Sequence, residues 1–167
     1  EKDFVAKLIA AKDAKQSEDF MIIARIEALI AQQGLEEALH RANAYERAGA
    51  DAILIHSKNK TPDEVFQFCD QYHGNLPLIV IPTSYPNVTL DELKSHNIKM
   101  VIYANQTLRV AHTAMKDLLT QISNHDNLAN VSTKISSMED IFELQEMYHL
   151  KNQEKNIESN LKKLGYV

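Results

Sequence analysis

The sequence has little cysteine, no long apolar run and no excess of positive charge. A single cysteine among 167 residues cannot form an internal disulfide or a zinc site, which favours a reducing compartment. The longest apolar run is only a few residues, far below the roughly 20 that a membrane-spanning helix needs. Lysine and arginine number 18 against 23 aspartates and glutamates, for a net charge of -5 spread along the chain. We therefore expect a soluble, cytoplasmic protein that binds neither membranes nor nucleic acid.

Several motifs that carry chemistry are also missing from the sequence. It contains neither the GxGxxG loop nor the P-loop pattern, the two glycine-rich motifs that cradle nucleotide phosphates. Its histidines show no HExxH or other metal-ligand spacing, and no cluster of aspartates follows an apolar run. The sequence thus has no motif for nucleotide binding and no evident set of metal ligands.

Four short apolar runs, rich in β-branched residues, recur along the chain. They cover residues 20–24, 52–55, 78–81 and 100–103, and each is separated from the next by a segment with helical periodicity. Such runs have the length and composition of strands that are buried on both faces. Strands that alternate with helices are typical of βαβ units, in which crossover helices pack on a parallel sheet. The sequence therefore predicts an α/β fold.

The helical segments carry start and stop signals. An apolar stripe over residues 35–48 is followed by Gly49, a common residue after the end of a helix. The pattern Thr61-Pro62-Asp63-Glu64 predicts a helix capped by the hydroxyl of Thr61, with Glu64 reaching back to the cap. Similar signals predict further helix starts at Thr89 with Glu92, at Thr107, and at Ser136 with Glu139.

The two ends of the chain differ in pattern. Apolar residues recur at helical spacing over residues 4–10, so the chain starts inside a helix, and we expect further sequence to precede Glu1. Residues 151–163 are polar and are predicted to be exposed. We expect two regions: residues 1–124, with about four βα units, and residues 125–167, with a connector and an extra C-terminal helix.

Two architectures fit four βα units. A complete (β/α)8 barrel needs about 250 residues, so 167 residues supply about half of one. Half a barrel has two open edges and an uncovered apolar face, which further sequence or another chain must cover. The competing architecture is a small doubly wound open sheet, for which four strands are enough. We favour the TIM-type (β/α)8 barrel, because the chain also starts inside a helix.

Polar residues follow each predicted strand, at the end where parallel α/β folds place their sites. Side chains two residues apart in a strand share a face, so Ile23, Arg25 and Glu27 point one way, as do Leu54 and His56. An arginine presents a fixed fork of donors that suits a carboxylate or a phosphoryl group, and a neighbouring histidine can donate a second hydrogen bond. Arg25 and His56 are therefore our candidate catalytic and substrate-binding residues. They imply a small anionic substrate.

Other interpretations of these residues stay open. Arg25 and Glu27 can form an ion pair that closes the end of the barrel, with no part in binding. His56 can be a hydrogen-bonded structural histidine. Thr83 and Ser84 follow the third predicted strand and are as consistent with a turn as with ligand binding.

Three blocks of sequence carry a resemblance to a known family. They are residues 19–30 (DFMIIARIEALI), 34–38 (GLEEA) and 48–58 (AGADAILIHSK), and they resemble the phosphoenolpyruvate mutase family of the isocitrate lyase superfamily. The resemblance continues through residues 81–83 and 101–105 and fades towards the C-terminus. The chain departs from the family after Ala31, where mutases commonly have Gly-Trp-Gly and this chain has Gln32-Gln33-Gly34.

The resemblance implies a fold and an assembly. The fold is a (β/α)8 barrel of which this chain supplies the second half. The terminal helix is exchanged between the subunits of a dimer, and the dimer pairs into a tetramer. The Mg2+ ligands, the nucleophile and the gating loop belong to the first half of such a barrel, so this polypeptide alone is expected to be catalytically incomplete.

The resemblance also implies an activity. The family interconverts phosphoenolpyruvate and phosphonopyruvate, with Mg2+ holding the pyruvyl oxygens, and Arg25 and His56 match the residues that grip the phosphoryl group. Phosphonopyruvate hydrolase shares the same blocks and transfers the phosphoryl group to water instead. A non-catalytic half-barrel that binds small anions is the alternative from a different class of protein.

Overall fold

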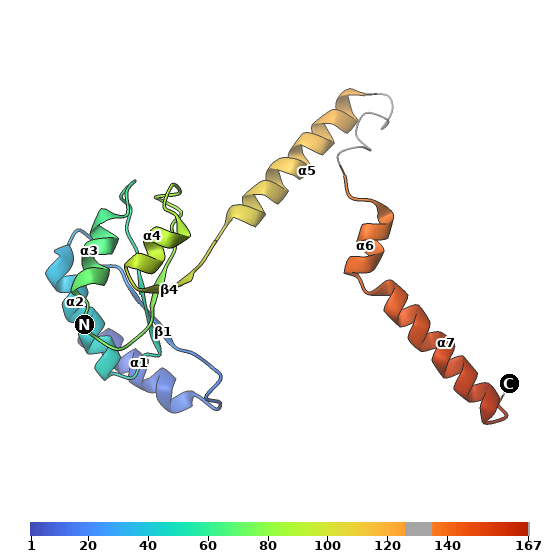
Figure 1. Ribbon diagram of the computed structural model, residues 1–167, viewed down its shortest axis with the longest axis horizontal. Coiled ribbons are helices and arrows are strands. Elements are labelled where there is room, and N and C mark those ends of the chain that lie inside the picture. Colours follow the sequence, from blue (N-terminus) through green and yellow to red (C-terminus); the bar gives the residue numbers. More distant parts are fainter. Residues whose placement is uncertain (126–134, 167) are drawn as a thin grey trace. The chain divides into compact units, whose positions relative to one another are not determined.

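The computed structural model describes residues 1–125 and 135–166, which belong to two compact units. The first unit, Glu1–Gln106, holds a parallel sheet with helices packed on it. The second unit, Thr107–Val167, consists of helices in its described part (Figure 1). The predicted division between a barrel half ending at residue 124 and an exchanged C-terminal helix stays a prediction.

The sheet of the first unit contains four described strands: β1 (Ile23–Ile26), β2 (Ala52–Ile55), β3 (Leu78–Val80) and β4 (Ile98–Val101). They lie in the order of the sequence, and each pairs in parallel with the next. The predicted alternation of strands and helices is confirmed. The fourth strand starts earlier than predicted, at Ile98, because Ile98 pairs with Leu78 and is buried against the helices.

The first strand begins at Ile23, later than predicted. The backbone N–H of Phe20 donates to the carbonyl of Ser17 (3.2 Å) and closes a turn, and the Phe20 side chain is exposed. The pairing with β2 starts at Ile23, directly after Ile22, whose N–H donates to the carboxylate of Asp51 (2.8 Å). The apolar run at residues 20–24 therefore begins before the strand, because Phe20 belongs to the preceding turn.

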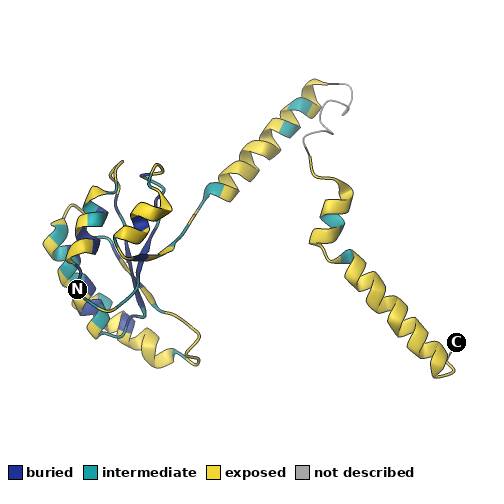
Figure 2. Ribbon diagram, viewed as in Figure 1, coloured by how far each residue is buried: buried dark blue, intermediate teal, exposed yellow. Residues whose placement is uncertain are grey.

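Four helices cover one face of this sheet: α1 (Lys2–Ala14), α2 (Gly34–Arg47), α3 (Asp63–Gln71) and α4 (Leu90–Ser95). Figure 2 shows the buried residues gathered where these helices meet the strands. The amphipathic helix predicted at the start of the chain is α1, which contributes Leu8 to this core. The strand residues of this face are buried: Ala24, Ile26, Ile53, Ile55, Leu78, Val80 and Ile98.

The opposite face of the sheet is less covered. Leu54 and Ile79 form a small cluster there with Ala52, and Ile81 and Ile102 pack beside it, partly buried. Burial alternates along β1, whose Ala24 and Ile26 face the helices, so Ile23 and Arg25 lie on this less covered face. The predicted grouping of Arg25 with His56 on one face follows, since His56 lies two residues after Leu54 in the chain.

Two predicted helix boundaries of the first unit are confirmed. Thr89 caps α4, because its hydroxyl accepts the N–H of Glu92 (3.2 Å) while the Glu92 carboxylate accepts the N–H of Thr89 (2.7 Å). Gly49 follows α2 with a φ of 90°, a left-handed conformation that suits glycine. The sequence signals for these two boundaries act through local contacts, which explains why they are reliable here.

The predicted cap at Thr61 is wrong. Helix α3 begins at Asp63 after Pro62, and no side chain caps its first turn. The Thr61 hydroxyl donates to the carboxylate of Asp63 (2.8 Å), while the carboxylate of Glu64 accepts the hydroxyl of Ser57. Ser57, which lies outside the helix, thus binds the Glu64 carboxylate that the sequence pattern predicted would reach back to the cap.

The second unit contains α5 (Gln106–Asn124), α6 (Met138–Leu144) and α7 (Met147–Lys163). Helix α5 begins at Gln106, so Thr107 lies inside the helix and does not cap it. Ser137, not Ser136, caps α6: its hydroxyl accepts the N–H of Asp140 (3.1 Å), and the Asp140 carboxylate accepts the N–H of Ser137 (3.0 Å). The predicted extra C-terminal helix is therefore two helices, and the polar end of the chain lies in α7.

None of the described residues of α5, α6 and α7 is buried. The polar residues 151–163 are exposed, as predicted. Most of the predicted connector, residues 126–134, lies outside the described residues. Among the helices of the described part of the chain, none combines the length and the apolar character that a bilayer crossing requires.

Candidate anion site at the carboxyl ends of the strands

Arg25 and His56 lie at the carboxyl ends of neighbouring strands. Arg25 belongs to β1 and pairs in register with Leu54 of β2, and His56 follows directly after β2 ends. Strand spacing of about 4.8 Å and a rise of about 3.3 Å per residue place the two α-carbons about 8 Å apart. An extended arginine side chain spans such a distance, so the sheet brings the guanidinium and the imidazole to one edge of one face.

Arg25 forms an ion pair with Glu27, which shares its face of the strand. Each of the two side chains is 46% exposed. The ion pair that the sequence left open as an alternative is therefore present. Because an exposed pair contributes only about 0–1 kcal/mol to stability, the guanidinium can leave this carboxylate at little cost when an anion binds.

His56 is half-buried, and its Nδ1 has no hydrogen-bond partner among the described residues. Burial lowers the pKa of the imidazole, the positive charge of Arg25 lowers it further, and the negative charge of Glu27 acts in the opposite direction. The imidazole is therefore neutral at pH 7 and carries one donor and one acceptor nitrogen. Because buried polar atoms in folded proteins nearly always have a partner, this Nδ1 is available for a hydrogen bond that the described residues do not supply.

Unpartnered polar atoms also follow the next two strands. Among the described residues, the buried side-chain oxygens without a hydrogen-bond partner are Thr83 Oγ1, Tyr85 Oη and Asn105 Oδ1. Thr83 follows β3 and Asn105 follows β4, whereas Tyr85 belongs to the core on the helical face, where burial raises its pKa to about 12. The carboxyl ends of β2, β3 and β4 thus each carry an unsatisfied polar group.

Ser57 shows the opposite behaviour to its neighbour His56. Its side chain is fully buried, its hydroxyl donates to Glu64 and it accepts the N–H of Asn59 (2.9 Å). These bonds hold the loop after β2 against the first turn of α3. Ser57 is therefore a structural residue, although it stands in the same polar stretch of sequence as His56.

The loop after β1 contains the departure from the family pattern. Gln32 has a φ of 57° and Gly34 a φ of 87°. Gln32 therefore holds a left-handed conformation that a glycine adopts without strain and that most other residues avoid. The glutamine stands where mutases commonly carry a glycine, and the loop keeps the glycine-like backbone.

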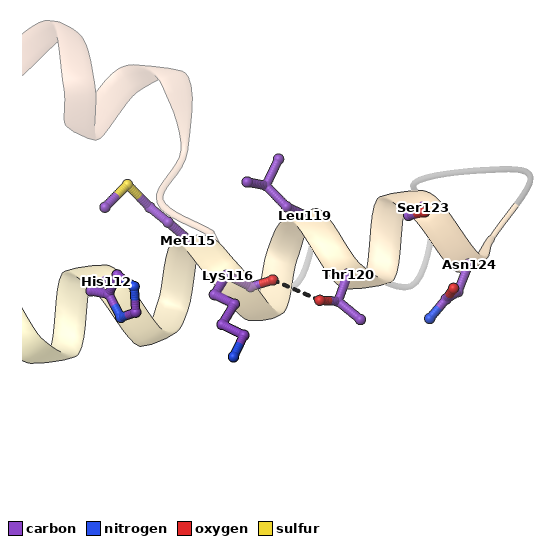
Figure 3. A pocket seen from close by; sticks show the side chains of 7 residues that line it. All are labelled: His112, Met115, Lys116, Leu119, Thr120, Ser123 and Asn124. Atoms are coloured by element: carbon purple, nitrogen blue, oxygen red, sulfur yellow. Dashed lines mark hydrogen bonds between the residues drawn. The ribbon is translucent and has the colours of Figure 1, made fainter.

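A hollow lies on α5 and is drawn in Figure 3. Its lining residues all come from that helix, from His112 to Asn124, and the Thr120 hydroxyl donates to the carbonyl of Lys116 (2.9 Å). The lining includes His112 and Lys116, one helical turn apart, but both belong to a single helix without buried residues. Arg25 and His56, by contrast, come from neighbouring strands of the sheet. We therefore take the carboxyl ends of the strands as the candidate site.

The described residues supply no metal centre. Nowhere in residues 1–125 and 135–166 do three or more histidine, cysteine, aspartate or glutamate side chains gather as metal ligands. At the candidate site, the carboxylate of Glu27 is already paired with Arg25. The residues described here therefore do not fit a bound Mg2+ by themselves.

Comparison with known sequences identifies the family. The model of the family described as phosphoenolpyruvate phosphomutase matches residues 1–123. The chain therefore belongs to the phosphoenolpyruvate phosphomutase family. It is 43% identical over 153 residues to a phosphoenolpyruvate phosphomutase of Tetrahymena pyriformis, covering 92% of this chain and 51% of the relative. It is 42% identical over 144 residues to a phosphonopyruvate hydrolase of Variovorax sp. (strain Pal2), covering 86% and 50%.

Solved structures confirm the fold class. A phosphoenolpyruvate phosphomutase from Streptomyces platensis subsp. rosaceus superposes with a TM-score of 0.89 at 40% identity, covering 92% of this chain and 53% of that one. A phosphonopyruvate hydrolase in complex with oxalate and Mg2+ gives 0.88 at 39% identity, covering 92% and 55%. The chain spans about half the length of the relatives it matches, which are TIM barrels. The order β1-β2-β3-β4, without reversal, agrees with a barrel and not with a doubly wound sheet.

Proposed function

We propose that the whole protein interconverts phosphoenolpyruvate and phosphonopyruvate. The proposal rests on the two side chains that lie at neighbouring strand ends in this member of the family. One is the half-exposed guanidinium of Arg25, and the other is the half-buried imidazole of His56. In this isomerisation the phosphoryl group leaves the enol oxygen of phosphoenolpyruvate and is bonded to the methylene carbon in phosphonopyruvate. One phosphorus–oxygen bond breaks and one phosphorus–carbon bond forms, without net loss of atoms.

Arg25 and His56 act on the transferring group through charge and hydrogen bonds. The guanidinium exchanges Glu27 for two oxygens of the phosphoryl group, because its fork of N–H donors matches such an anion. The neutral imidazole donates one further hydrogen bond to the same group. Donors that are fixed in place before the reaction stabilise the charge that develops as the phosphoryl group moves.

Mg2+ is the proposed cofactor of the whole protein. A phosphonopyruvate hydrolase that this chain resembles has been solved with oxalate and Mg2+, which supports a divalent cation as cofactor. When bound, such an ion polarises substrate oxygens as a Lewis acid. Its ligands are proposed to come from residues outside this sequence, because the described residues bring no ligand set together.

Phosphonopyruvate hydrolysis is the second candidate activity. It is favoured by the nearly equal identity to a hydrolase, 42% against 43% for a mutase. In that reaction water supplies the oxygen that attacks phosphorus, the phosphorus–carbon bond breaks, and pyruvate and phosphate are released. Arg25 and His56 would hold the phosphoryl group in the same way, so these two residues do not separate the activities.

Phosphorus NMR of the full-length protein with phosphonopyruvate and Mg2+ distinguishes the candidates. Formation of phosphoenolpyruvate supports the mutase, whereas formation of phosphate and pyruvate identifies the hydrolase. A folded protein that binds phosphonopyruvate without turning it over is the non-catalytic anion-binding half-barrel. No binding and no turnover by folded protein would contradict all three.

The proposal extends to assembly as a homo-oligomer, a dimer of dimers formed by helix exchange. Helices α5 and α7 expose large apolar side chains, and a second copy of the chain is the partner that would cover them. These side chains include Leu108, Val110, Met115, Leu119, Ile122, Ile157 and Leu161. Leu119→Asp should dissociate the oligomer in sedimentation experiments, while Lys116→Asp on the same helix should leave it intact. A monomeric wild type would contradict the proposal.

The proposed location is the cytoplasm. The single cysteine, Cys69, is buried in α3, and burial raises the pKa of its thiol to about 12. A protonated, buried thiol is compatible with a reducing compartment and is not a redox-active group. Cell fractionation with an antibody to the full-length protein tests the location, and recovery in a membrane or secreted fraction would contradict it.

A further inference from the structure

The hydroxyl of Thr83 is a buried donor without a partner in the described residues. Leaving a buried hydroxyl unsatisfied is unfavourable, and buried polar groups in folded proteins nearly always have a partner. A hydroxyl in this state at the edge of a binding site calls for a partner that arrives with the ligand. The following inference rests on the proposed function, since it concerns the same site.

The position of Thr83 relative to His56 follows from the strand register. Leu54 of β2 pairs with Ile79 of β3, and both belong to the cluster on the less covered face of the sheet. His56 and Ile81 each follow by two residues. Thr83 follows Ile81 by two residues, in a turn closed by a hydrogen bond from the N–H of Thr83 to the Ile81 carbonyl (2.9 Å). Thr83 therefore stands just beyond His56 along the rim formed by the strand ends.

The other unpartnered oxygens are less suited to hold an anion. The free atom of Asn105 is its carbonyl oxygen, which accepts hydrogen bonds and would repel an anion. The Tyr85 hydroxyl lies in the core on the helical face, away from the face that carries Arg25 and His56. Ser84 is half-buried and has no buried unsatisfied atom. Thr83 alone among these four combines an unsatisfied donor with a place beside His56.

We propose that Thr83 is a substrate-binding residue whose hydroxyl donates a hydrogen bond to the anionic group held by Arg25 and His56. The three residues come from the ends of three consecutive strands, so the anion meets donors from β1, β2 and β3. The described residues leave the Thr83 hydroxyl without a partner, and in this proposal the bound anion supplies one. Part of the binding energy thus comes from relieving a polar group that folding leaves unpaired.

The test compares three variants of the full-length protein. Thr83→Val keeps the shape of the side chain and removes the donor, Thr83→Ser keeps the donor, and Ser84→Ala removes the neighbouring hydroxyl as a control. Measurements are the affinity for phosphonopyruvate and for inorganic phosphate, the turnover of phosphonopyruvate, and the thermal midpoint without ligand. A hydrogen bond to a charged group predicts a loss of about 10- to 100-fold in affinity for Thr83→Val. Thr83→Ser and Ser84→Ala should stay within about threefold of the wild type.

The thermal midpoint separates a binding role from a structural one. Because Thr83→Val removes an unsatisfied hydroxyl, its midpoint without ligand should equal or exceed that of the wild type. A lower midpoint with unchanged affinity would overturn the inference, since the hydroxyl would then have a partner in the free protein. Equal anion affinity of Thr83→Val and wild type, or no anion binding by the wild type, would also overturn it. If the wild type binds the anions without turnover and Thr83→Val binds them weakly, the inference stands and the proposed activity fails.

Discussion

The amino and carboxyl ends of the four strands differ in how far their polar side chains are hydrogen-bonded. At the amino end, the carboxylate of Asp51 accepts the N–H of Ile22 (2.8 Å) and lies 3.6 Å from the ammonium of Lys15. At the carboxyl end, His56, Thr83 and Asn105 each keep a buried atom without a partner among the described residues. Among the described residues, the polar atoms that remain free of hydrogen bonds at the carboxyl end are the ones to which we assign a ligand in the proposals above. The amino end serves stability, as in other barrels of this type.

The largest expected effect separates activity from stability at the carboxyl end. Arg25→Ala should lower kcat/KM for phosphonopyruvate by at least about 100-fold, because it removes the donor fork that holds the phosphoryl group. The thermal midpoint should hardly change, since the ion pair with Glu27 is half exposed. Arg25→Lys keeps the charge without the fork and should recover activity only in part. Near-normal activity in Arg25→Ala, together with a lower midpoint, would show that Arg25 contributes only the structural ion pair with Glu27.

The amino end should respond in the opposite way. Asp51→Ala should lower the free energy of unfolding by about 1–2 kcal/mol, because the N–H of Ile22 loses its acceptor, and should leave the affinity for phosphate unchanged. Urea unfolding at pH 7 measures the first effect and titration with phosphate the second. Asp91→Ala is the control, because the Asp91 side chain is exposed and lies 3.8 Å from Lys94; it should change stability by less than about 1 kcal/mol.

The pH dependence sharpens the prediction for Asp51. The hydrogen bond from Ile22 lowers the pKa of Asp51 most, and the charges of Lys15 and Lys12 lower it further. A carboxylate whose pKa is lower in the folded state stabilises the protein above its unfolded pKa, near 3.9. This stabilisation is lost as the pH falls through the lower folded pKa. The difference between wild type and Asp51→Ala should therefore shrink below about pH 4, and a constant difference would contradict this explanation.

Two adjacent residues allow the same contrast within one loop. Ser57→Ala should cost about 1 kcal/mol of stability, because Glu64 loses a donor and the N–H of Asn59 loses an acceptor. His56→Gln should leave the thermal midpoint nearly unchanged, because Nδ1 of His56 has no partner to lose among the described residues. The same variant should lower turnover severalfold or more. Melting curves and turnover of both variants, measured side by side, decide the matter. A large loss of stability in His56→Gln would make His56 structural.

The smallest expected effect is a gain. Gln32→Gly should raise the free energy of unfolding by less than about 1 kcal/mol, since relief of a left-handed φ of 57° is partly offset by the flexibility that glycine adds to the unfolded chain. Asn97, with a φ of 59°, is the matched control, and Asn97→Gly should gain less because asparagine tolerates this conformation better. Urea midpoints of the two variants measure the difference. A loss of stability in Gln32→Gly would show that the glutamine side chain contributes more than its backbone conformation costs.

The sequence was sufficient for the faces of the strands. A side-chain period of two residues placed Arg25 on one face with Ile23, and His56 with Leu54, and the observed burial agrees. The same period could not set where a strand begins, because Phe20 and Met21 are apolar yet lie before β1. Tertiary contacts, here the bond between Ile22 and Asp51, fixed that boundary.

Helix starts were predictable where a local pattern had no competing partner, as at Thr89, and not where another group competed, as at Thr61. Ser136 with Glu139 and Ser137 with Asp140 have the same spacing, and the chain uses the second pair. The state of a polar atom was not predictable at all, because Thr83 and Ser84 look alike in sequence and only the fold leaves one of them unsatisfied. Site residues can therefore be proposed from the sequence, whereas the polar atoms that lack a hydrogen-bond partner can be identified only in the folded structure.

The strand order has a consequence for how the chain acquires its structure. Each strand pairs with the one made just before it, so every pairing closes a segment of only about 20 to 30 residues, with a correspondingly small entropic cost. On the ribosome, a new strand can dock as soon as its preceding helix has emerged, without waiting for distant parts of the chain. The strand order thus allows the sheet to form from β1 to β4 in the direction of synthesis.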